Sequence, residues 1–445
     1  MRIVHVTAGA GGRICGSCLH DNTLVRALVA RGSDAILVPA YVPTTTDEEN
    51  IAEQRIVMGG VNVWLQEHVP LFRHTPAWID WLLDSRRLLE WLSSRNGATR
   101  PADLGPLTIS TLRGMQGNQR KEVAKLTRWL ACDVRPDVVH LSNALLLGLA
   151  RPIREATGAR IVCSLSGEDI FIDQIPAPHH TTIVKLLREG AADVDHFVAL
   201  NQFFATFMGE RLAVRPEAVS VIPHGVDLAE FPPEPPDLVA RRRGRGNRLV
   251  VGFLARACPE KGLDQLIRAL PLLAARHQVE ILAAGATVDA ERDYIAQCHA
   301  VARDLGVADR FRWLGQIDRS GKLDLLASVD VFLMPTTHAE AKGLPVIEAM
   351  AAGVPIGASN HGAFPELLDD ERAGLLHTPG DPADLASKIA AILDDESLAS
   401  RLGRHGHALA RERHTAHQMA AAHEALYERV FLRGNRERER RETGS

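Results

Sequence analysis

One stretch about three-quarters of the way along the chain combines a short strand, a polar loop and the start of a helix. The apolar run at residues 329–335 predicts a buried strand, and the proline at its end stops it because proline cannot donate a ladder hydrogen bond. Gly343 then frees the backbone, Pro345 suits the first position of a helix, and Gly353 marks its end. This order predicts an anion site, because N–H groups and the dipole of a helix N-terminus attract negative charge.

Two carboxylates flank the predicted anion site. Glu340 lies in the loop, and Glu348 lies about one turn into the helix. A carboxylate repels a phosphate, so these side chains are better suited to accept hydrogen bonds from hydroxyl groups beside it. A phosphate next to hydroxyl groups suggests a nucleotide sugar as the ligand.

Strands and helices alternate through most of the 445 residues, a length that predicts two domains of roughly 200 residues each. The alternation predicts an α/β protein with two doubly wound parallel sheets. The second block restarts after a proline-rich segment and the basic run at residues 241–245, which we expect to be solvated. The last helix of the second domain has the option of packing back on the first domain. The predicted boundaries are an N-terminal domain at 1–228, a linker at 229–248, a C-terminal domain at 249–432 and a disordered tail at 433–445.

Residues 44–130 interrupt the alternation and predict a helical insertion in the first domain. A helix is expected from Thr75 to about Ser94, and four of the six tryptophans fall between Trp64 and Trp91. These tryptophans are interpreted as core residues of the insertion. An apolar rim beside an acceptor cleft, or a shallow peripheral membrane contact, is the alternative.

The first turn of the chain is rich in glycine and includes Gly11 and Gly12, where backbone can approach a ligand closely. The glycines do not form G-x-G-x-x-G in register, and no acidic residue ends the second strand, so a dinucleotide site is disfavoured. Cys15 and Cys18 are interpreted as small residues of a tight loop. The D-x-D pair at Asp193 and Asp195 falls at a helix-to-strand junction and is interpreted as structural.

Bulk properties exclude several classes of function. A formal net charge of −4 leaves no basic footprint for nucleic acid. No apolar run reaches the roughly 18 residues of a membrane helix, and the chain enters a strand at once, without room for a signal peptide. Six cysteines in 445 residues do not form a disulfide framework, so a cytoplasmic protein is expected.

Two cations belong with the anion site. Arg256 and Lys261 follow the first strand of the second domain and precede its first helix. Ligands of open α/β sheets bind at the carboxyl ends of strands, so both side chains are expected to face the same cleft as Glu340. Arginine can hold a diphosphate with two hydrogen bonds, and lysine adds a compact charge.

With these motifs the chain resembles the glycosyltransferases of family 4, which have the GT-B architecture of two Rossmann-like domains facing across a cleft. The resemblance covers nearly the whole chain outside residues 44–130. The motifs that carry it occur in the family's order and spacing, and they are residues 136–140, residues 222–227, Arg256 with Lys261 and Gly262, the E-x7-E pair Glu340 and Glu348, residues 362–366 and residues 374–376.

The resemblance implies a retaining transfer of a hexose from a nucleotide-diphosphate sugar to a hydroxyl group, without a metal ion or a cofactor. It implies three catalytic residues, in which Arg256 and Lys261 hold the diphosphate and Glu340 binds the transferred sugar. The implied donor-binding residues are Glu348 at the ribose hydroxyls, the N–H groups of Gly343 and Leu344, Gly11 and Gly12 from across the cleft, and Gln316 near the base. The acceptor, an unknown carbohydrate, lipid or small molecule, would be selected by residues 9–20 and 44–130, and the oligomeric state stays open.

Two departures from the family pattern matter. Many relatives have a histidine near the transferred sugar where this chain has Ser166, which can form a hydrogen bond but cannot carry charge. Relatives often have Gly-Phe after the first glutamate, where this chain has Ala341 and Lys342. The alternatives are a sugar-nucleotide epimerase or phosphorylase of the same fold, or a nucleotide-sugar-binding protein without catalytic activity.

Overall fold

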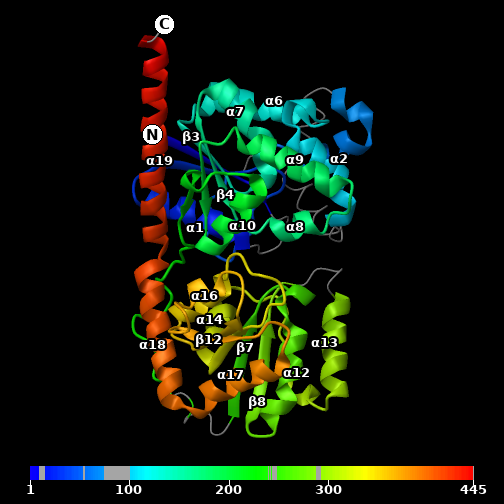
Figure 1. Ribbon diagram of the computed structural model, residues 1–445, viewed down its shortest axis with the longest axis vertical. Helices are drawn as coiled ribbons and strands as arrows, with labels where there is room; N and C mark the ends of the chain where they lie inside the picture. The colour runs from blue at the N-terminus through cyan, green and yellow to red at the C-terminus, as the bar shows by residue number, and fades with distance from the viewer. Residues whose placement is uncertain are drawn as a thin grey trace. The chain divides into compact units, whose positions relative to one another are not determined.

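The computed structural model contains, in its described residues, two six-stranded parallel sheets covered by helices (Figure 1). The chain divides into two compact units: unit 1 holds Met1–Gly225 and Ala416–Ser445, and unit 2 holds Val226–Thr415. The predicted pair of parallel-sheet α/β domains is confirmed. The structure describes residues 1–9, 16–53, 56–74, 101–238, 240, 242, 248–286 and 292–443.

The sheet of unit 1 has the strand order β2-β1-β3-β4-β5-β6, and all neighbouring strands are parallel. Every residue of β3 is buried, as expected for a central parallel strand with helices on both faces. The strand order reverses between β1 and β3, which is where ligands bind in folds of this kind. The strands are β1 (Arg2–Thr7), β2 (Asp34–Pro39), β3 (Val138–Leu141), β4 (Arg160–Leu165), β5 (His196–Ala199) and β6 (Val219–Val221).

The described part of the predicted insertion between β2 and β3 is helical, with α2, α5 and α6 as its longer helices. Trp64 on α2 is 48% exposed and stacks on His68, so the prediction of a core position is wrong for this tryptophan. The predicted helix at 75–94, with Trp78, Trp81 and Trp91, lies outside the described residues. The α-helices described in unit 1 are α1 (Gly16–Ala30), α2 (Gly60–His68), α5 (Gly105–Leu112), α6 (Arg120–Trp129), α7 (Ala150–Thr157), α8 (Asp169–Asp173), α9 (His179–Ala191), α10 (Gln202–Leu212) and α19 (Ala416–Thr443).

The long helix α19 returns the end of the chain to unit 1, where it packs against α1 (Figure 1). Met419, Leu426 and Tyr427 are buried in the same apolar core as Leu24 of α1. The sequence predicted that this helix ends the second domain, with the option of packing back on the first domain, and that a disordered tail follows it. In the structure it belongs to unit 1, and it continues through residue 433 to Thr443.

Buried histidines gather where β1, β3, α1 and α19 meet. The imidazole of His140 lies 2.6 Å from the hydroxyl of Tyr427 through Nδ1 and 2.8 Å from Ser164 Oγ through Nε2. These contacts connect α19 to two strands of the sheet through polar groups that are sealed from water. The members of this histidine cluster are His5, His20, His140, His224 and His423.

Burial disfavours the charged form of these imidazoles. It lowers the pKa of His20 and of His140 well below the ordinary value of 6.5, and neighbouring histidines lower both further. Burial is also the main reason why the pKa of His423 is lowered to about 4. His20, His140 and His423 are therefore neutral in the folded protein near pH 7.

The sheet of unit 2 has the order β12-β11-β10-β7-β8-β9, again with parallel neighbours. The order reverses between β7 and β10, which lie side by side at its centre. Its strands are β7 (Arg248–Leu254), β8 (Gln278–Ala284), β9 (Phe311–Trp313), β10 (Val331–Met334), β11 (Ile356–Ser359) and β12 (Gly374–His377). Its described α-helices are α12 (Leu263–Ala274), α13 (Arg292–Asp304), α14 (Arg319–Ser328), α15 (Leu344–Ala351), α16 (Phe364–Leu367), α17 (Pro382–Asp394) and α18 (Glu396–Arg413).

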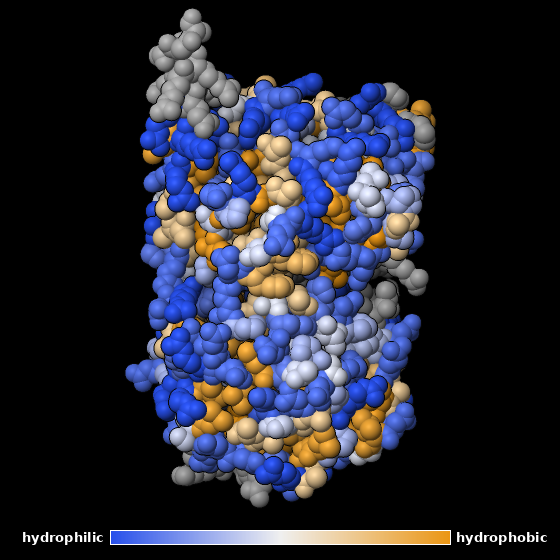
Figure 2. Space-filling model, in the orientation of Figure 1, coloured by the Kyte–Doolittle hydropathy of each residue, from blue (hydrophilic) through white to orange (hydrophobic). Residues whose placement is uncertain are grey.

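The predicted linker at 229–248 is partly buried in unit 2. Leu238 belongs to its apolar core, and Arg242 is buried with its Nε 3.3 Å from Asp330 Oδ1. The prediction of a solvated basic run is therefore wrong for Arg242, because Asp330 compensates its buried charge. Elsewhere, the face drawn in Figure 2 is mostly hydrophilic with scattered apolar groups. Among the described helices, none is both long and apolar enough to cross a membrane.

Candidate functional site

The predicted donor-site loops of unit 2 follow β7 and β10, the two central strands between which the strand order reverses. Val251 of β7 is in register with Val331 of β10, so the loops that leave their carboxyl ends start next to each other. This is the position at which open α/β sheets hold ligands. The strand predicted at residues 329–335 and the helix predicted after the loop are confirmed by β10 and α15.

The loop after β7 contains Arg256, which is exposed, and a short 3₁₀ turn at Pro259–Lys261. Gly262 follows with φ of +72°, and a Cβ atom at this position would lie 1.8 Å from the carbonyl oxygen of Pro335. Only glycine fits this contact, which brings the loop after β7 against the loop after β10. The turn therefore presents Lys261 to the residues that follow β10.

Lys261 and Glu340 form an ion pair through Nζ and Oε2, and the Glu340 side chain is 13% exposed. Burial alone would raise the pKa of the Glu340 carboxyl, but the Lys261 ammonium outweighs it by charge and hydrogen bonding and lowers the pKa to about 2. Glu340 is thus a carboxylate at any physiological pH. The two residues that the sequence assigned to diphosphate and sugar lie together in one half-buried pair.

The backbone around Glu340 is fixed by the loop after β11. The N–H of Ala363 donates to the carbonyl of Glu340 over 2.8 Å. Gly362 has φ of +62°, and a Cβ there would lie 2.5 Å from the nitrogen of Glu340. The N–H of Lys342, where the chain departs from the family pattern, donates to Glu340 Oε1 over 3.4 Å. These contacts hold the carboxylate by backbone geometry as well as by charge.

Helix α15 begins within one residue of the predicted start. Gly343 is its N-cap with φ of +67°, Leu344 is its first residue, and Pro345 follows. Glu348 lies on the second turn and is only 2% exposed. Its Oε1 atom is 2.6 Å from Lys322 Nζ and 3.7 Å from Arg319 Nη1, both on α14.

Neither of these two cations was predicted as a site residue. Lys322 precedes Leu325 and Leu326 by three and four residues, so helical periodicity places it on the buried face of α14. A lysine at such a position needs a buried anion, and that signal could have found it. Gln316, predicted near the base, is exposed in the bend between β9 and α14.

The predicted site residues of unit 1 are only partly described. Gly11, Gly12 and Cys15 lie outside the described residues. Cys18 is buried in helix α1, so the prediction of a tight loop is wrong for this cysteine. Ser166 is buried after β4, and its hydroxyl donates to the carbonyl of Ser142 over 3.0 Å. The hydroxyl proton is engaged in this hydrogen bond, so towards a ligand Ser166 Oγ can act only as an acceptor.

Glu168 fixes the loop that contains Ser166. Its carboxylate accepts the N–H of Ser166 over 2.7 Å and the N–H of Ala144 over 3.2 Å. Burial raises the pKa of Glu168 against the opposing effect of these bonds. The carboxylate therefore ties together the loops that follow β3 and β4.

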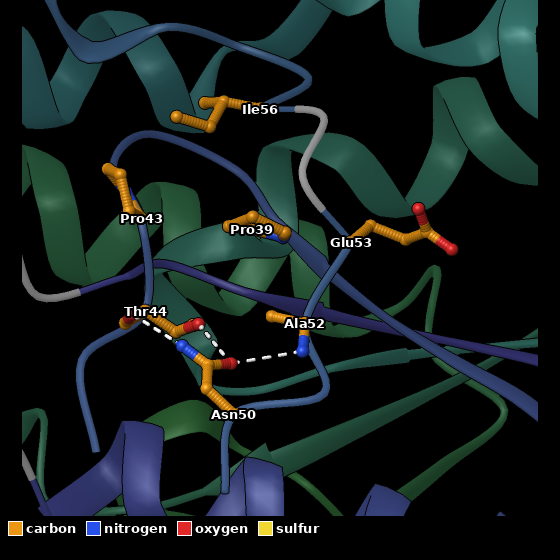
Figure 3. Close-up of a pocket in the computed structure, with 7 residues that line it drawn as sticks. All are labelled: Pro39, Pro43, Thr44, Asn50, Ala52, Glu53 and Ile56. Atoms are coloured by element: carbon orange, nitrogen blue, oxygen red, sulfur yellow. Dashed lines mark hydrogen bonds between the residues drawn. The ribbon is translucent and has the colours of Figure 1, made fainter. Parts of the chain in front are cut away.

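A small polar cavity of about 130 Å³ lies after β2, within the segment that was predicted to select the acceptor (Figure 3). The side chain of Asn50 spans it, with Nδ2 donating to the carbonyl of Thr44 over 2.8 Å and Oδ1 accepting the N–H of Ala52 over 3.0 Å. Pro39, Pro43, Glu53 and Ile56 complete the lining. These polar groups mainly stabilise the loop itself.

The D-x-D pair is structural, as predicted. Asp193 pairs with Arg151, while Asp195 pairs with Arg154 over 2.7 Å and with Arg160 over 3.2 Å. Throughout the described ranges, no three histidine, cysteine, aspartate or glutamate side chains gather closely enough to hold a metal ion.

Two protein-family models match the chain. Residues 104–230 match the model described as Glycosyltransferase Family 4. Residues 239–408 match the model described as Glycosyl transferases group 1, and they include every predicted site residue of unit 2.

Two curated relatives illustrate the similarity in sequence. The chain is 32% identical over 279 residues to a GDP-mannose-dependent alpha-(1-6)-phosphatidylinositol monomannoside mannosyltransferase of Mycolicibacterium smegmatis, covering 60% of this chain and 70% of the relative. It is 28% identical over 360 residues to the 2-deoxystreptamine glucosyltransferase of Streptomyces kanamyceticus, covering 73% and 87%.

Solved structures share the fold over the whole length. HepE of Anabaena, solved in complex with UDP, is 21% identical with a TM-score of 0.68, covering 96% of this chain and 100% of the other. The sucrose-phosphate synthase of Thermosynechococcus elongatus is 18% identical with a TM-score of 0.71, covering 97% and 100%.

Proposed function

The chain belongs to the group 1 glycosyltransferases of family 4, which have the GT-B fold, and from this membership we propose a more specific reaction. The protein transfers a hexose from a nucleoside-diphosphate sugar to a hydroxyl group of its acceptor. The transfer retains the anomeric configuration and needs no metal ion. The observation that carries the proposal is the group of charged residues at the switch point of unit 2, where Lys261, Glu340 and Glu348 are held by buried contacts.

The donor diphosphate binds between the loop after β7 and the N-terminus of α15. Arg256 and Lys261 supply positive charge, and the N–H groups of Gly343 and Leu344 add the dipole of the helix. Glu348 accepts hydrogen bonds from the ribose hydroxyls. Gln316 lies near the base.

The reaction breaks the bond between the anomeric carbon and the diphosphate oxygen and forms a bond from that carbon to the acceptor oxygen. In a front-face attack the departing phosphate takes the proton of the acceptor hydroxyl, so no enzymic nucleophile is required. Arg256 and Lys261 stabilise the negative charge that develops on the phosphate. One hydrogen-bond donor in such a position contributes on the order of 3 kcal/mol to stabilising the transition state.

The rival mechanism uses two carboxylates, one as nucleophile and one as acid. Glu340 is poorly suited to act as the acid, since its pKa of about 2 leaves it without a proton near neutral pH. Glu348 is poorly suited to act as the nucleophile, since Lys322 and Arg319 hold it within a buried ion pair. The missing proton on Glu340 and the buried ion pair of Glu348 therefore favour binding roles.

The similar proteins are associated with different nucleotides. The mycobacterial relative is GDP-mannose-dependent, whereas HepE was solved with UDP. The base and the sugar of this protein are therefore best found by a thermal-shift screen of GDP-mannose, UDP-glucose and ADP-glucose. A ligand present at 100 times its dissociation constant adds about 2.7 kcal/mol of stability.

Acceptor-dependent release of the nucleoside diphosphate tests the reaction itself. Each donor that binds is incubated with panels of carbohydrate, lipid and small-molecule hydroxyl acceptors. We expect release only in their presence, and the anomeric proton of the product should report the same configuration as the donor in NMR spectra. Conversion of the donor without an acceptor would instead favour an epimerase, and binding without any turnover would favour a protein that only binds nucleotide sugars.

A further inference from the structure

Lys322 is a buried cation that no motif assigned to the site. Its side chain is 8% exposed and its Nζ lies 2.6 Å from Oε1 of Glu348, whose side chain is 3% exposed. The two residues come from neighbouring helices, α14 and α15. Both charges are thus nearly sealed from water and compensate each other at hydrogen-bonding distance.

Arg319 completes this arrangement from one turn earlier on α14. Its Nη1 lies 3.7 Å from the same oxygen of Glu348, and its Nε lies 2.8 Å from Glu230 Oε2. Its guanidinium also lies over the ring of Phe231, with 5.4 Å between Cζ and the ring centroid. Arg319 is therefore shared among several partners, while Lys322 makes the shorter contact with Glu348.

A buried ion pair is seldom retained for stability alone. Apolar residues of similar volume usually stabilise a protein as well or better, because removing two charges from water is costly. A role for the pair must therefore use the ionised carboxylate. Glu348 can accept strong hydrogen bonds from hydroxyl groups only while it is charged and held in one orientation.

We propose that Lys322 is a positioning residue for donor binding, which holds the Glu348 carboxylate ionised and oriented to accept the ribose hydroxyls. This inference rests on the proposed function. Lys322 acts through Glu348, and its contribution depends on whether the ligand has ribose hydroxyls. A purely structural lysine would affect ribose and deoxyribose ligands alike.

The test measures hydroxyl discrimination by isothermal titration calorimetry. ADP, GDP and UDP identify the nucleotide that the full chain binds, and the 2′-deoxy and 3′-deoxy forms of that nucleotide are then compared with it. The variants are Lys322→Met, which removes the charge, and Lys322→Arg, which keeps it. Lys185→Met is the matched control, because Lys185 is 75% exposed on unit 1.

We expect the wild type and Lys185→Met to bind the ribose form at least about tenfold more tightly than one deoxy form, as for a hydrogen bond to a charged group. Lys322→Met should reduce this ratio to below about threefold, and Lys322→Arg should restore most of it. The ratio of the two dissociation constants is measured on folded molecules only, so a partly unfolded sample does not change it. If Lys322→Met does not fold, Lys322→Gln, which removes the charge but keeps a hydrogen-bond donor, is measured in its place and should show the same low ratio.

Two results would overturn the inference, and they differ in what they say about the function. An unchanged ratio in Lys322→Met, with the wild type discriminating normally, would remove the role of Lys322 and leave the donor site in place. Absence of binding by all three nucleotides to the wild type would remove the donor assignment itself. A higher ratio in Lys322→Met would show that Lys322 competes with the ribose for Glu348, which also contradicts the proposal.

Discussion

Lys261 and Glu340 form an ion pair that joins the loop after β7 to the loop after β10. The two residues are separated by 79 positions in the sequence, and they meet because β7 and β10 are adjacent where the strand order reverses. The pair leaves the carboxylate charged and fixes the ammonium at the edge of the proposed diphosphate site. Its two functions, stability and charge for the donor, can be separated by mutation.

Replacing Lys261 with alanine should impair both functions. The Glu340 carboxylate would remain mostly buried without its cation, which should lower the free energy of unfolding by about 2–3 kcal/mol. Loss of a charge at the leaving phosphate should lower kcat/KM by about 100-fold or more. The double variant Lys261→Met with Glu340→Gln should regain stability in urea unfolding but not activity. Equal recovery of both would contradict a role of Lys261 in the reaction.

Replacing Arg256 should affect binding without affecting stability, because its side chain is exposed. Arg256→Ala should weaken the binding of the donor diphosphate by about tenfold or more, as for a lost charge-assisted hydrogen bond. Arg256→Lys should recover only part of this loss, since lysine cannot form the paired hydrogen bonds of a guanidinium. Calorimetric titration and Tm measured on the same samples check both statements, and a fall in Tm that matches the lost affinity would argue for a structural role.

Two glycines with similar backbone angles offer a matched test of the contact between the site loops. Gly262 and Gly306 have φ of +72° and +69°. A Cβ at Gly262 would lie 1.8 Å from Pro335 O, whereas a Cβ at Gly306 would face open space among the described residues. Gly306→Ala should cost about 1 kcal/mol from the backbone angle alone. Gly262→Ala should cost clearly more, because the loops must separate, and it should also weaken donor binding. Equal losses in urea unfolding would show that the close contact is unimportant.

The histidine cluster predicts a loss of stability in mild acid. The folded pKa of His423 is about 4, below the ordinary 6.5, so below pH 6.5 the unfolded chain binds a proton that the folded protein does not. Each such histidine should lower the free energy of unfolding by about 1.4 kcal/mol per pH unit as the pH falls from 6.5 toward its folded pKa. Urea unfolding at pH 7.5, 6.0 and 5.0 should show this slope.

Replacing one histidine tests whether the cluster causes the pH dependence of the free energy of unfolding. His423→Leu removes one buried imidazole and should reduce the pH dependence by roughly the contribution of one histidine. Lys185→Met is the control, because it changes an exposed side chain on α9 and removes no imidazole. Identical slopes in the wild type and His423→Leu would contradict the account of the cluster. The Glu340 carboxyl adds nothing in this range, since its contribution is complete above pH 4.5 and is lost only as the pH falls through about 2.

The sequence predicted the parts of the structure that depend on local patterns. The apolar run before Pro335 became β10, and Gly343 with Pro345 marked the start of α15 to within a residue. These signals are local because they arise from backbone angles and missing hydrogen-bond donors. The position of Arg256 and Lys261 after a strand was also predicted locally, because the apolar run at residues 249–254 marks that strand.

Contacts between distant segments were not predictable in this way. Nothing near Glu348 indicates that Lys322, 26 residues earlier, would be buried against it. The packing of the last helix on the first domain was left as an option, because a contact that fixes it, between Tyr427 and His140, joins residues 287 positions apart. The exposed Trp64 shows the converse, because a helical apolar pattern does not reveal which side chains remain at the surface.

Glu348 is the residue on which the proposed nucleotide-sugar site depends most. Isothermal titration calorimetry of the nucleotide sugar selected by thermal shift, with the wild type and Glu348→Ala, measures this directly. Glu189→Ala, at an exposed position in α9, controls for the loss of a carboxylate, and circular dichroism verifies that each variant is folded. We predict that Glu348→Ala weakens binding by about tenfold or more while Glu189→Ala binds like the wild type. Unchanged affinity in a folded Glu348→Ala variant would contradict the donor site.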